Sequence, residues 1–574
     1  MLEFRAPALD GDAIFPSTNG DRGASVLPLA DLIRGDFRPT MIALSIGATL
    51  LLLIAIFNVA GLLLVKARRK RRDMAIRDAL GASPNRQLLQ FATEGVLVSI
   101  TSVVLSSLLT AAVIPVLRSL IPSRMEETLP TILTLHLSWP EIAFFSTAGA
   151  FSALLFAIIP MTAFFAGSRM QALHDGGLSS TGTDRRTLGS RLIIGELAIT
   201  VLLLVSAGLL AKSYNKLQHV DLGVLPKDLA VMQIEIPDQL TGLQRVATTD
   251  RILGSVLALP GIKAAGLSYG IATGGSDNYC HFHVPGRFYT GQGEESNLLS
   301  ASTGYFETVQ ATLIKGRFFT GADRTSNRPV VVINETMARH FFPGEEPIGK
   351  NVVCEWLSNR PLEVIGVIHD IQEQALDSEP RNAAYTSFEQ GPDSVVFLTV
   401  RDKLADESNL KALQLAVVRA APGVVVDQPE MMQQRIEQTP ESYLHRAAAW
   451  LTSSFAAIAA LLAFVGIYGT VSYSVALRTR EIAVRLAVGA PIHSIYQMIF
   501  IEGLRLAGWG AALGLLASLL AASSLRSLLF EVKPWDVFAH LSALLGAGFV
   551  ALLACLVPGR NAARVSPIEA LKSD

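Results

Sequence analysis

The sequence is poor in charged residues. Asp, Glu, Lys and Arg make up only 17% of its 574 residues, whereas soluble domains usually carry about 25%. The mean hydropathy is +0.40, so the charge must be confined to particular segments while the rest lies in lipid. A formal net charge of -1 leaves no excess of positive charge to attract a nucleic acid. These shortages favour an integral membrane protein with no nucleic-acid partner.

Cysteine is also scarce. The three cysteines, Cys280, Cys354 and Cys555, are too few for a disulfide framework. Cys555 lies within an apolar run and is expected to pack as a small hydrophobic residue. Cys280 and Cys354 could pair in an oxidising compartment, and the sequence leaves that pairing open.

The first 40 residues contain no apolar core of a signal peptide, so membrane targeting falls to the first spanning segment. A spanning helix needs about 20 apolar residues to cross about 30 Å of hydrocarbon. The sequence therefore predicts a polytopic α-helical membrane protein with seven transmembrane helices, in contact with the lipid bilayer. The seven apolar runs are 41–65, 92–117, 141–165, 192–211, 448–476, 497–522 and 538–558.

Basic residues gather in alternate short loops, which predicts the orientation. The intervening loops carry only Arg118 and Arg124, or Arg526 and Lys533. With seven spans, all basic loops fall on one side of the membrane, which this asymmetry makes the cytoplasmic side. The N-terminus is then outside and the C-terminus is cytoplasmic. The basic segments are 66–77, 166–191, 477–496 and the tail 559–574.

Residues 213–446 are then expected to form one α+β domain inserted outside the cytoplasm. Short β-rich runs alternate there with helical stretches, and Gly and Pro separate them. A segment of this length can bury a core of its own. The expected strands are 229–236, 330–333, 362–368 and 395–400, and the expected helices are 334–342 and 408–420.

An internal repeat is the strongest signal. Arg72–Ala82 reads RDMAIRDALGA and Arg480–Ala490 reads REIAVRLAVGA, at an offset of 408 residues. Glu94-Gly95 and Glu502-Gly503 follow at the same offset. Each copy is a helix, a basic cytoplasmic segment, a second helix, an external loop and a third helix.

The repeated cytoplasmic segment is predicted to be a short amphipathic helix. In each copy an acid and an Arg four residues later can pair, and a basic residue three positions before the acid shares their face. Ile482, Leu486 and Ala487 are expected on the opposite face, and the Gly-Ala pair should end the helix. One alternative is a positively charged anchor in the headgroups. Because both copies share the spacing, a docking element for a cytoplasmic partner is favoured. The predicted coupling residues are Lys70, Asp73, Arg77, Gly81, Arg478, Glu481, Arg485 and Gly489.

These motifs resemble a known family. The repeated segment, its following helices and the tail from Pro558 to Leu571 resemble the FtsX-like permease domain. Residues 207–223 resemble the start of the MacB-type periplasmic core domain, and the motifs between Tyr305 and Lys350 resemble its interior. Together the motifs cover most of the chain from about residue 26.

The duplicated arrangement resembles the duplicated orphan permeases of Acidobacteria and their relatives, in which two four-helix units lie in one chain. Against that pattern, the first helix and the first periplasmic domain are missing. Truncation or a misplaced start is favoured over the alternative that another chain supplies the missing helix. The expected domains are a remnant of the first outside domain at 1–40, a first permease domain at 41–175, a helix opening the second unit at 190–212, the periplasmic core domain at 213–446 and a second permease domain at 447–574.

The resemblance implies a permease subunit of an ABC-type transporter. A separate cytoplasmic ABC ATPase would bind the ATP, so this chain itself needs no cofactor and is not an enzyme. ATP hydrolysis would move the outside domain for efflux of peptides, macrolides or lipid-linked substrates. A membrane-fusion or outer-membrane component is a further candidate partner. The alternative is a mechanotransmission regulator of an extracytoplasmic enzyme that moves no solute.

Four other features are interpreted as structural. Residues 344–350 fit a phosphate-binding loop in part, but Asn351 stands where Ser or Thr should be. Residues 280–283 read Cys-His-Phe-His, a fragment of a metal site with no third ligand to assign. Glu196 is expected to pair with Arg191 or to snorkel to the interface. Asn58 is expected to bond a neighbouring helix.

Overall fold

The computed structural model describes residues 38–69, 84–119, 139–140, 142–151, 154 and 182–564, with short gaps at 275–277, 288, 290–292, 326–327, 355–356, 358–359 and 403–406. The chain divides into two compact units. Unit 1 contains the described residues up to Ser213 and from Arg446 onward, and unit 2 is Tyr214–His445. Each unit is considered by itself.

Unit 1 is helical. Six of its helices contain segments long and apolar enough to span a membrane, which confirms six of the seven expected spans. Of the expected span at 141–165, the structure describes the short apolar helix Ile142–Phe151, so the seventh span stays a prediction. The helices are α2 (Arg38–Arg69), α4 (Pro84–Ser119), α8 (Gly182–Leu217), α15 (Pro440–Leu477), α16 (Thr479–Ala487), α17 (Ile492–Leu525) and α18 (Val537–Ala563), with the 3-10 turn η3 at Arg526–Leu528.

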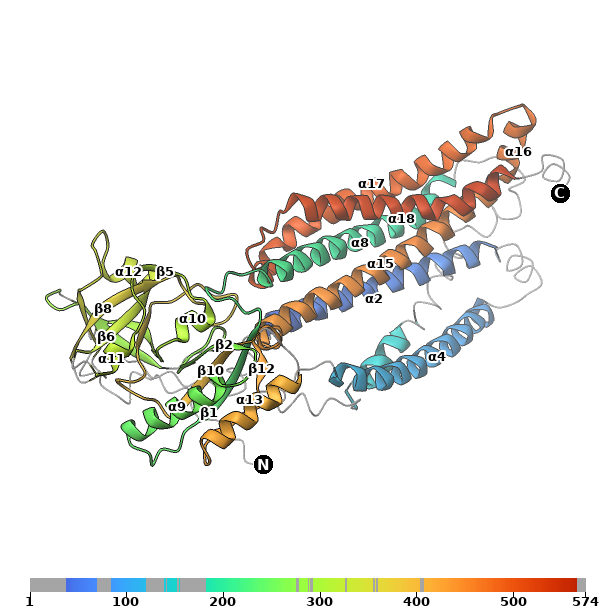
Figure 1. Ribbon diagram of the computed structural model, residues 1–574. Coiled ribbons are helices and arrows are strands. Elements are labelled where there is room, and N and C mark those ends of the chain that lie inside the picture. The colour runs from blue at the N-terminus through green and yellow to red at the C-terminus, as the bar shows by residue number, and fades with distance from the viewer. Residues whose placement is uncertain are drawn as a thin grey trace, which may run out of the picture. The chain divides into compact units, whose positions relative to one another are not determined.

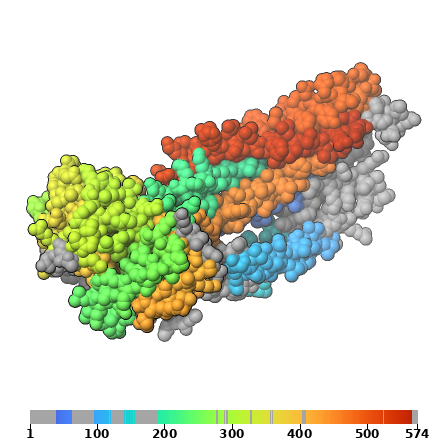
Figure 2. All heavy atoms as spheres, viewed as in Figure 1, coloured from blue at the N-terminus to red at the C-terminus, as the bar shows by residue number. Residues whose placement is uncertain are grey.

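Helix α8 is the most enclosed of these spans. Of its most apolar window 56% is buried, against 33% or less for each of the other five. Small residues let neighbouring helices approach it closely. A Cβ placed on Gly514 of α17 would lie 2.5 Å from the carbonyl oxygen of Ala198, and one on Gly208 of α8 would lie 3.5 Å from the Cβ of Ala539 in α18. Figures 1 and 2 show α8, α15, α17 and α18 lying along one another.

Unit 2 is the expected α+β domain, and the strands and helices named from the sequence are confirmed by β1, β6, β8, β10, α12 and α13. Its strands are β1 (Leu229–Glu235), β2 (Ile262–Ser268), β3 (Tyr279–His283), β4 (Glu294–Ala301), β5 (Leu313–Gly316), β6 (Val330–Asn334), β7 (Asn351–Cys354), β8 (Pro361–Ile368), β9 (Ala383–Ser387), β10 (Val395–Asp402), β11 (Val425–Val426) and β12 (Glu430–Met431). Its helices are α9 (Gly242–Leu257), α10 (Tyr305–Val309), α11 (Gly321–Thr325), α12 (Glu335–Phe341), α13 (Glu407–Ala420) and α14 (Met432–Glu437).

The first part of unit 2 is a split βαβ arrangement. Strand β10 lies antiparallel to both β1 and β2, so β1 and β2 run in the same direction and α9 connects them. Ile252 of α9 and Val417 of α13 pack into one buried cluster with Met232 and Leu398 of the sheet. Both helices therefore cover this sheet (Figure 1).

The second part of unit 2 is a closed ring of strands. The pairings run β4–β3–β7–β8–β6–β9, and a parallel pairing of β9 with β4 closes the ring. Closure removes exposed strand edges. Strand β6 is buried on both faces, because Val330 and Val332 belong to one core cluster while Val331 and Ile333 belong to another. This explains the continuous apolar run in its sequence.

A disulfide joins two strands of this ring. Cys280 of β3 and Cys354 of β7 are bonded, with their Cα atoms 6.0 Å apart, and both side chains are buried. The pairing that the sequence left open is thus formed. Cys555 is a free, buried cysteine of α18, in agreement with the expected packing role.

Candidate coupling site

The short helix α16 forms the second copy of the repeated segment. Glu481 and Arg485 are both about half exposed and form an ion pair of 2.6 Å between Oε1 and Nη2, as the spacing predicts. Ile482 is buried on the opposite side and Leu486 is half-buried against the same core. Ala487, expected on the same side as these two residues, is exposed. Ala483 is buried beside Ile482.

Gly489 ends α16 in the predicted way. Its φ is +92°, a left-handed conformation that favours glycine. The amide of Ala490 donates to the carbonyl of Arg485 at 2.9 Å, and the amide of Gly489 donates to the carbonyl of Leu486 at 3.1 Å. These two bonds satisfy carbonyls that the helix end would leave without partners.

Arg478 does not share the exposed face of Glu481 and Arg485. It lies just before α16, and its guanidinium Nη1 is 3.5 Å from Oε2 of Glu502 in α17. Ser474 of α15 donates to Oε1 of the same carboxylate at 3.2 Å. Glu502 therefore ties the junction of α15 and α16 to α17. The sequence signal for this role was the repeated Glu-Gly, which was used only to define the repeat.

The exposed surface of α16 is mixed in character. Beside the charged pair, the side chains of Val484 and Val488 are 45% and 84% exposed. Apolar side chains next to a charged pair can serve a protein interface. The corresponding residues of the first copy, Lys70, Asp73, Arg77 and Gly81, lie outside the described residues, so their placement stays a prediction.

A polar junction lies within the helices of unit 1. Glu196 of α8 is 1% exposed and accepts a hydrogen bond from Asn58 Nδ2 of α2. Within the described part of the chain, the expected partner Arg191 forms no ion pair with Glu196. Arg191 is itself exposed. The prediction that Glu196 pairs with Arg191 or snorkels to the interface was wrong. Helices α2 and α15 bury the carboxyl, and its hydrogen-bond partner is Asn58. The prediction for Asn58 is confirmed.

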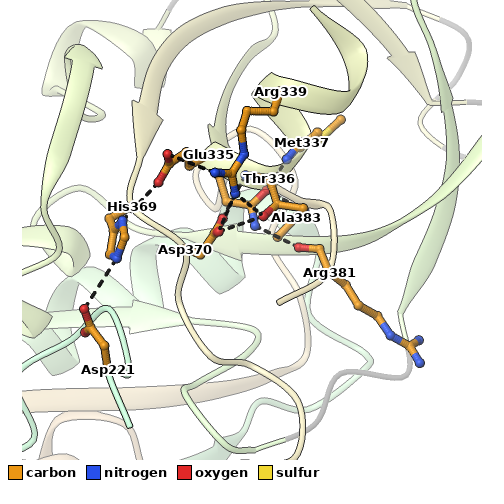
Figure 3. A network of polar contacts seen from close by, with 10 residues as sticks. Asp221, Glu335, Thr336, Met337, Arg339, His369, Asp370, Arg381 and Ala383 are labelled. Atoms are coloured by element: carbon orange, nitrogen blue, oxygen red, sulfur yellow. Dashed lines mark hydrogen bonds and ion pairs between the residues drawn. The ribbon is translucent and has the colours of Figure 1, made fainter. Parts of the chain in front are cut away.

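A polar network lies in unit 2 where the chain enters it from α8 (Figure 3). The imidazole of His369 lies between two carboxylates, 3.1 Å from Glu335 Oε2 at Nδ1 and 3.5 Å from Asp221 Oδ2 at Nε2. Asp370 accepts from the amide and the hydroxyl of Thr336, at 2.9 and 2.7 Å, and so caps the start of α12.

The same place holds the segment that follows α8 against the end of β8. The amide of Gln372 donates to the carbonyl of Leu222 at 3.0 Å. Gly223 has a φ of +68°, and a Cβ on it would lie 2.0 Å from the carbonyl oxygen of Asp370. Only glycine allows this approach. These contacts join residues 222–223 to the segment that follows β8.

Close to this network a carboxyl is fully enclosed. Glu373 accepts from Asn297 Nδ2 at 3.0 Å and from the hydroxyl of Tyr385. Burial raises the pKa of Glu373, the hydrogen bond from Asn297 lowers it and the charge of Asp370 raises it, which together bring it to about 8. The carboxyl is then largely protonated at neutral pH, so no bare charge is buried here.

The loop 344–350 and the Cys-His-Phe-His run at 280–283 both have structural roles in unit 2. The loop 344–350 follows α12 and leads into strand β7, which is the reverse of a strand–loop–helix phosphate site. Lys350 pairs with Glu345 of the same loop, and Lys315 pairs with Glu346 at 2.8 Å. Cys280 of the Cys-His-Phe-His run is taken by the disulfide. Among the described residues no group of three or more His, Cys, Asp or Glu side chains could hold a metal.

Comparison with known families matches both parts of the chain. The family described as the MacB-like periplasmic core domain matches residues 192–438. The family described as the FtsX-like permease C-terminal domain matches twice, at residues 45–172 and 453–567. The two FtsX-like matches contain the two copies of the repeated segment.

Individual proteins are similar over part of their length. The macrolide export ATP-binding/permease protein MacB of Nitrobacter winogradskyi is 30% identical over 47% of this chain and 43% of the relative. The protein of the same name from Mannheimia succiniciproducens is 28% identical over 48% of this chain and 43% of the relative. The chain thus spans less than half the length of these relatives. The solved periplasmic region of MacB from Actinobacillus actinomycetemcomitans is similar with a TM-score of 0.26 and 19% identity, over 38% of this chain and 95% of that one.

Proposed function

Because this chain is an ABC permease of the FtsX-like and MacB type, we propose that it couples ATP hydrolysis by a separate cytoplasmic ATPase to movement of its extracytoplasmic domain. The observation that carries the proposal is α16, whose apolar side is buried while a paired Glu481 and Arg485 face outward. The sequence repeats this segment at residues 70–82. Two such segments would provide one docking element for each subunit of an ATPase dimer.

Export is the direction of transport that the relatives favour. Their names describe macrolide export, which supports export over regulation of an extracytoplasmic enzyme. We propose apolar or amphipathic substrates of the macrolide, peptide or lipid-linked class. A membrane-fusion or outer-membrane component is proposed as a partner of unit 2. The relatives' names also join ATP binding to the permease, whereas here the ATPase is proposed as a partner chain.

The chain is a multi-pass protein of the inner membrane, and the proposed orientation places unit 2 outside the cytoplasm. The disulfide Cys280–Cys354 supports this, because disulfides persist in oxidising compartments. A cysteine introduced near residue 320 is expected to react with a membrane-impermeant maleimide in intact spheroplasts. A cysteine at Val488 should react only after permeabilisation. The opposite pattern would reverse the proposed orientation.

The coupling proposal is tested with a defined ATPase. A cytoplasmic ABC-type ATPase from the same organism that partners this chain should co-purify with it, and its hydrolysis rate should change on reconstitution with the full chain. The test variant changes Val484 and Val488 to Asp, which puts charge on the exposed apolar surface of α16 and leaves its buried side unchanged. We expect this variant to lose the effect on hydrolysis. An ATPase whose retention and rate are indifferent to the chain would refute the proposal.

A further inference from the structure

The two sequence repeats meet at equivalent positions of α2 and α15. The repeat offset of 408 residues places Asn58 at the position of Gly466, and Gly47 at that of Phe455. A Cβ on Gly466 would lie 2.9 Å from Asn58 Oδ1, and one on Gly47 would lie 3.0 Å from Cδ2 of Phe455. Equivalent positions contact each other only where an approximate twofold axis passes between them. We call this contact between α2 and α15 the repeat seam.

The carboxyl of Glu196 enters the repeat seam from α8. Its Oε2 would contact a Cβ at Gly466, so only a residue without a side chain leaves room for it there. Asn58 Nδ2 donates to Glu196 Oε1 and also to the carbonyl of Leu462, the latter at 3.1 Å. Both partners are acceptors, so this end of the amide must be the nitrogen.

The other end of the same amide has no partner. Asn58 Oδ1 is buried and accepts no hydrogen bond within the described residues. It faces the same point, beside Gly466, that Glu196 Oε2 faces. An ionised carboxylate would set a negative oxygen beside this carbonyl oxygen, and no cation of the described residues pairs with Glu196. The hydroxyl of Thr200 donates to the backbone carbonyl of Glu196, at 2.9 Å, and not to its carboxyl.

We propose that Glu196 binds a proton on Oε2 and donates it to Asn58 Oδ1. The carboxyl and the amide then form a cyclic pair with one hydrogen bond in each direction. This pair satisfies the buried oxygen and leaves no charge among the helices. It acts as a latch that holds α2 of the first repeat to α8 and to α15 of the second repeat. The proton is the ligand of the site, and Gly466 provides the space for it.

The first experiment measures the proton directly on the full chain in lipid. Wild-type protein at neutral pH should show the infrared carbonyl stretch of a protonated carboxylic acid that is shielded from water. Glu196→Gln should remove that band, and Glu196→Gln is close in shape to the protonated acid, so the variant should fold. Buried Glu373 contributes its own band, which is present in both proteins and cancels when the Glu196→Gln spectrum is subtracted from that of the wild type. Absence of a band assigned to Glu196 overturns the proposal.

The second experiment measures the latch. Cysteines at Gly47 and Phe455, in a Cys555→Ala background, report closure of the repeat seam through the yield of oxidative cross-linking. Glu196→Gln preserves a cyclic pair and should keep the parental yield, whereas Glu196→Ala and Asn58→Leu should lower it by about fivefold or more. Ser206→Ala is the control, since that hydroxyl bonds only its own helix at Leu202. A yield in Glu196→Gln as low as in Glu196→Ala would contradict the latch. Neither readout involves the ATPase, so their failure leaves the proposed coupling function untouched.

Discussion

Exchanging the two charges of α16, by Glu481→Arg together with Arg485→Glu, is expected to weaken binding and stimulation of the partner ATPase strongly while leaving the chain folded. The two side chains are about half exposed and bond each other at 2.6 Å. The exchange keeps an ion pair at the same spacing, so it tests the polarity of the surface and not the pairing itself. A helix with a purely structural role would tolerate it.

The expected energies distinguish a docking role of the charged pair from a purely structural one. An exposed ion pair of this kind contributes about 0.3–0.5 kcal/mol to stability. Reversing its order along the helix opposes the helix dipole and costs roughly 0.3–1 kcal/mol for each charge. Like charges brought together in a protein interface cost several kcal/mol, and each ~1.4 kcal/mol is tenfold in affinity. We therefore expect ATPase affinity to fall by about 10- to 100-fold, with a small change in thermal stability.

The measurement is the ATPase rate as a function of ATPase concentration with the chain in nanodiscs. Glu481→Asp with Arg485→Lys is the matched control and should retain most of the stimulation. Compensating charge reversals in the ATPase groove should restore the exchanged variant. If the exchanged chain stimulates the ATPase as the wild type does, α16 is an anchor in the headgroups and not a docking element.

Removing the disulfide of unit 2 is expected to have the second large effect. Replacing Cys280 and Cys354 with Ala should lower the free energy of unfolding of unit 2 by about 2–5 kcal/mol. The bond closes a separation of 74 residues, for which the loss of unfolded-chain entropy amounts to about 4 kcal/mol. Ala is chosen because both positions are buried and a Ser hydroxyl would need a partner.

Pulse proteolysis of the full chain in increasing urea measures this change, because unit 2 peptides can be identified by mass. Dithiothreitol should destabilise unit 2 of the wild type and have no effect on the double Ala variant. Cys555→Ala is the control, since that cysteine is free and lies in α18. Equal urea midpoints for wild type and double variant would show that the bond contributes nothing to stability.

Much of the helical architecture could be predicted because its causes are local. Six apolar segments are long enough to span a bilayer wherever they pack. Gly489 ends α16 because a left-handed residue must follow the last turn. Strands of unit 2 could also be predicted from local sequence. For example, Val330 to Ile333 is a run of β-branched residues, and it is buried on both faces.

The candidate site was predicted only in part. The pairing of Glu481 with Arg485 follows from their spacing on one helix. The contact of Arg478 with Glu502 does not, because it depends on how α17 folds back beside α15. The network around His369 likewise joins Asp221, Glu335 and His369 from three separate segments. No local rule relates such positions.

The sequence by itself determined the membrane class of this protein, its repeat and the amphipathic character of α16. These properties can be read from composition, from the spacing of apolar residues along one helix and from comparison of the chain with itself. Only the tertiary structure decided the partner of each buried polar group. Glu196 had Arg191 close by in sequence, yet it bonds Asn58, 138 residues away, once α2 and α15 exclude water from it. Cys280 forms a disulfide with Cys354 because β3 and β7 are adjacent in a closed ring of strands. A buried polar group must find its partner among the residues that enclose it, and those are set by packing.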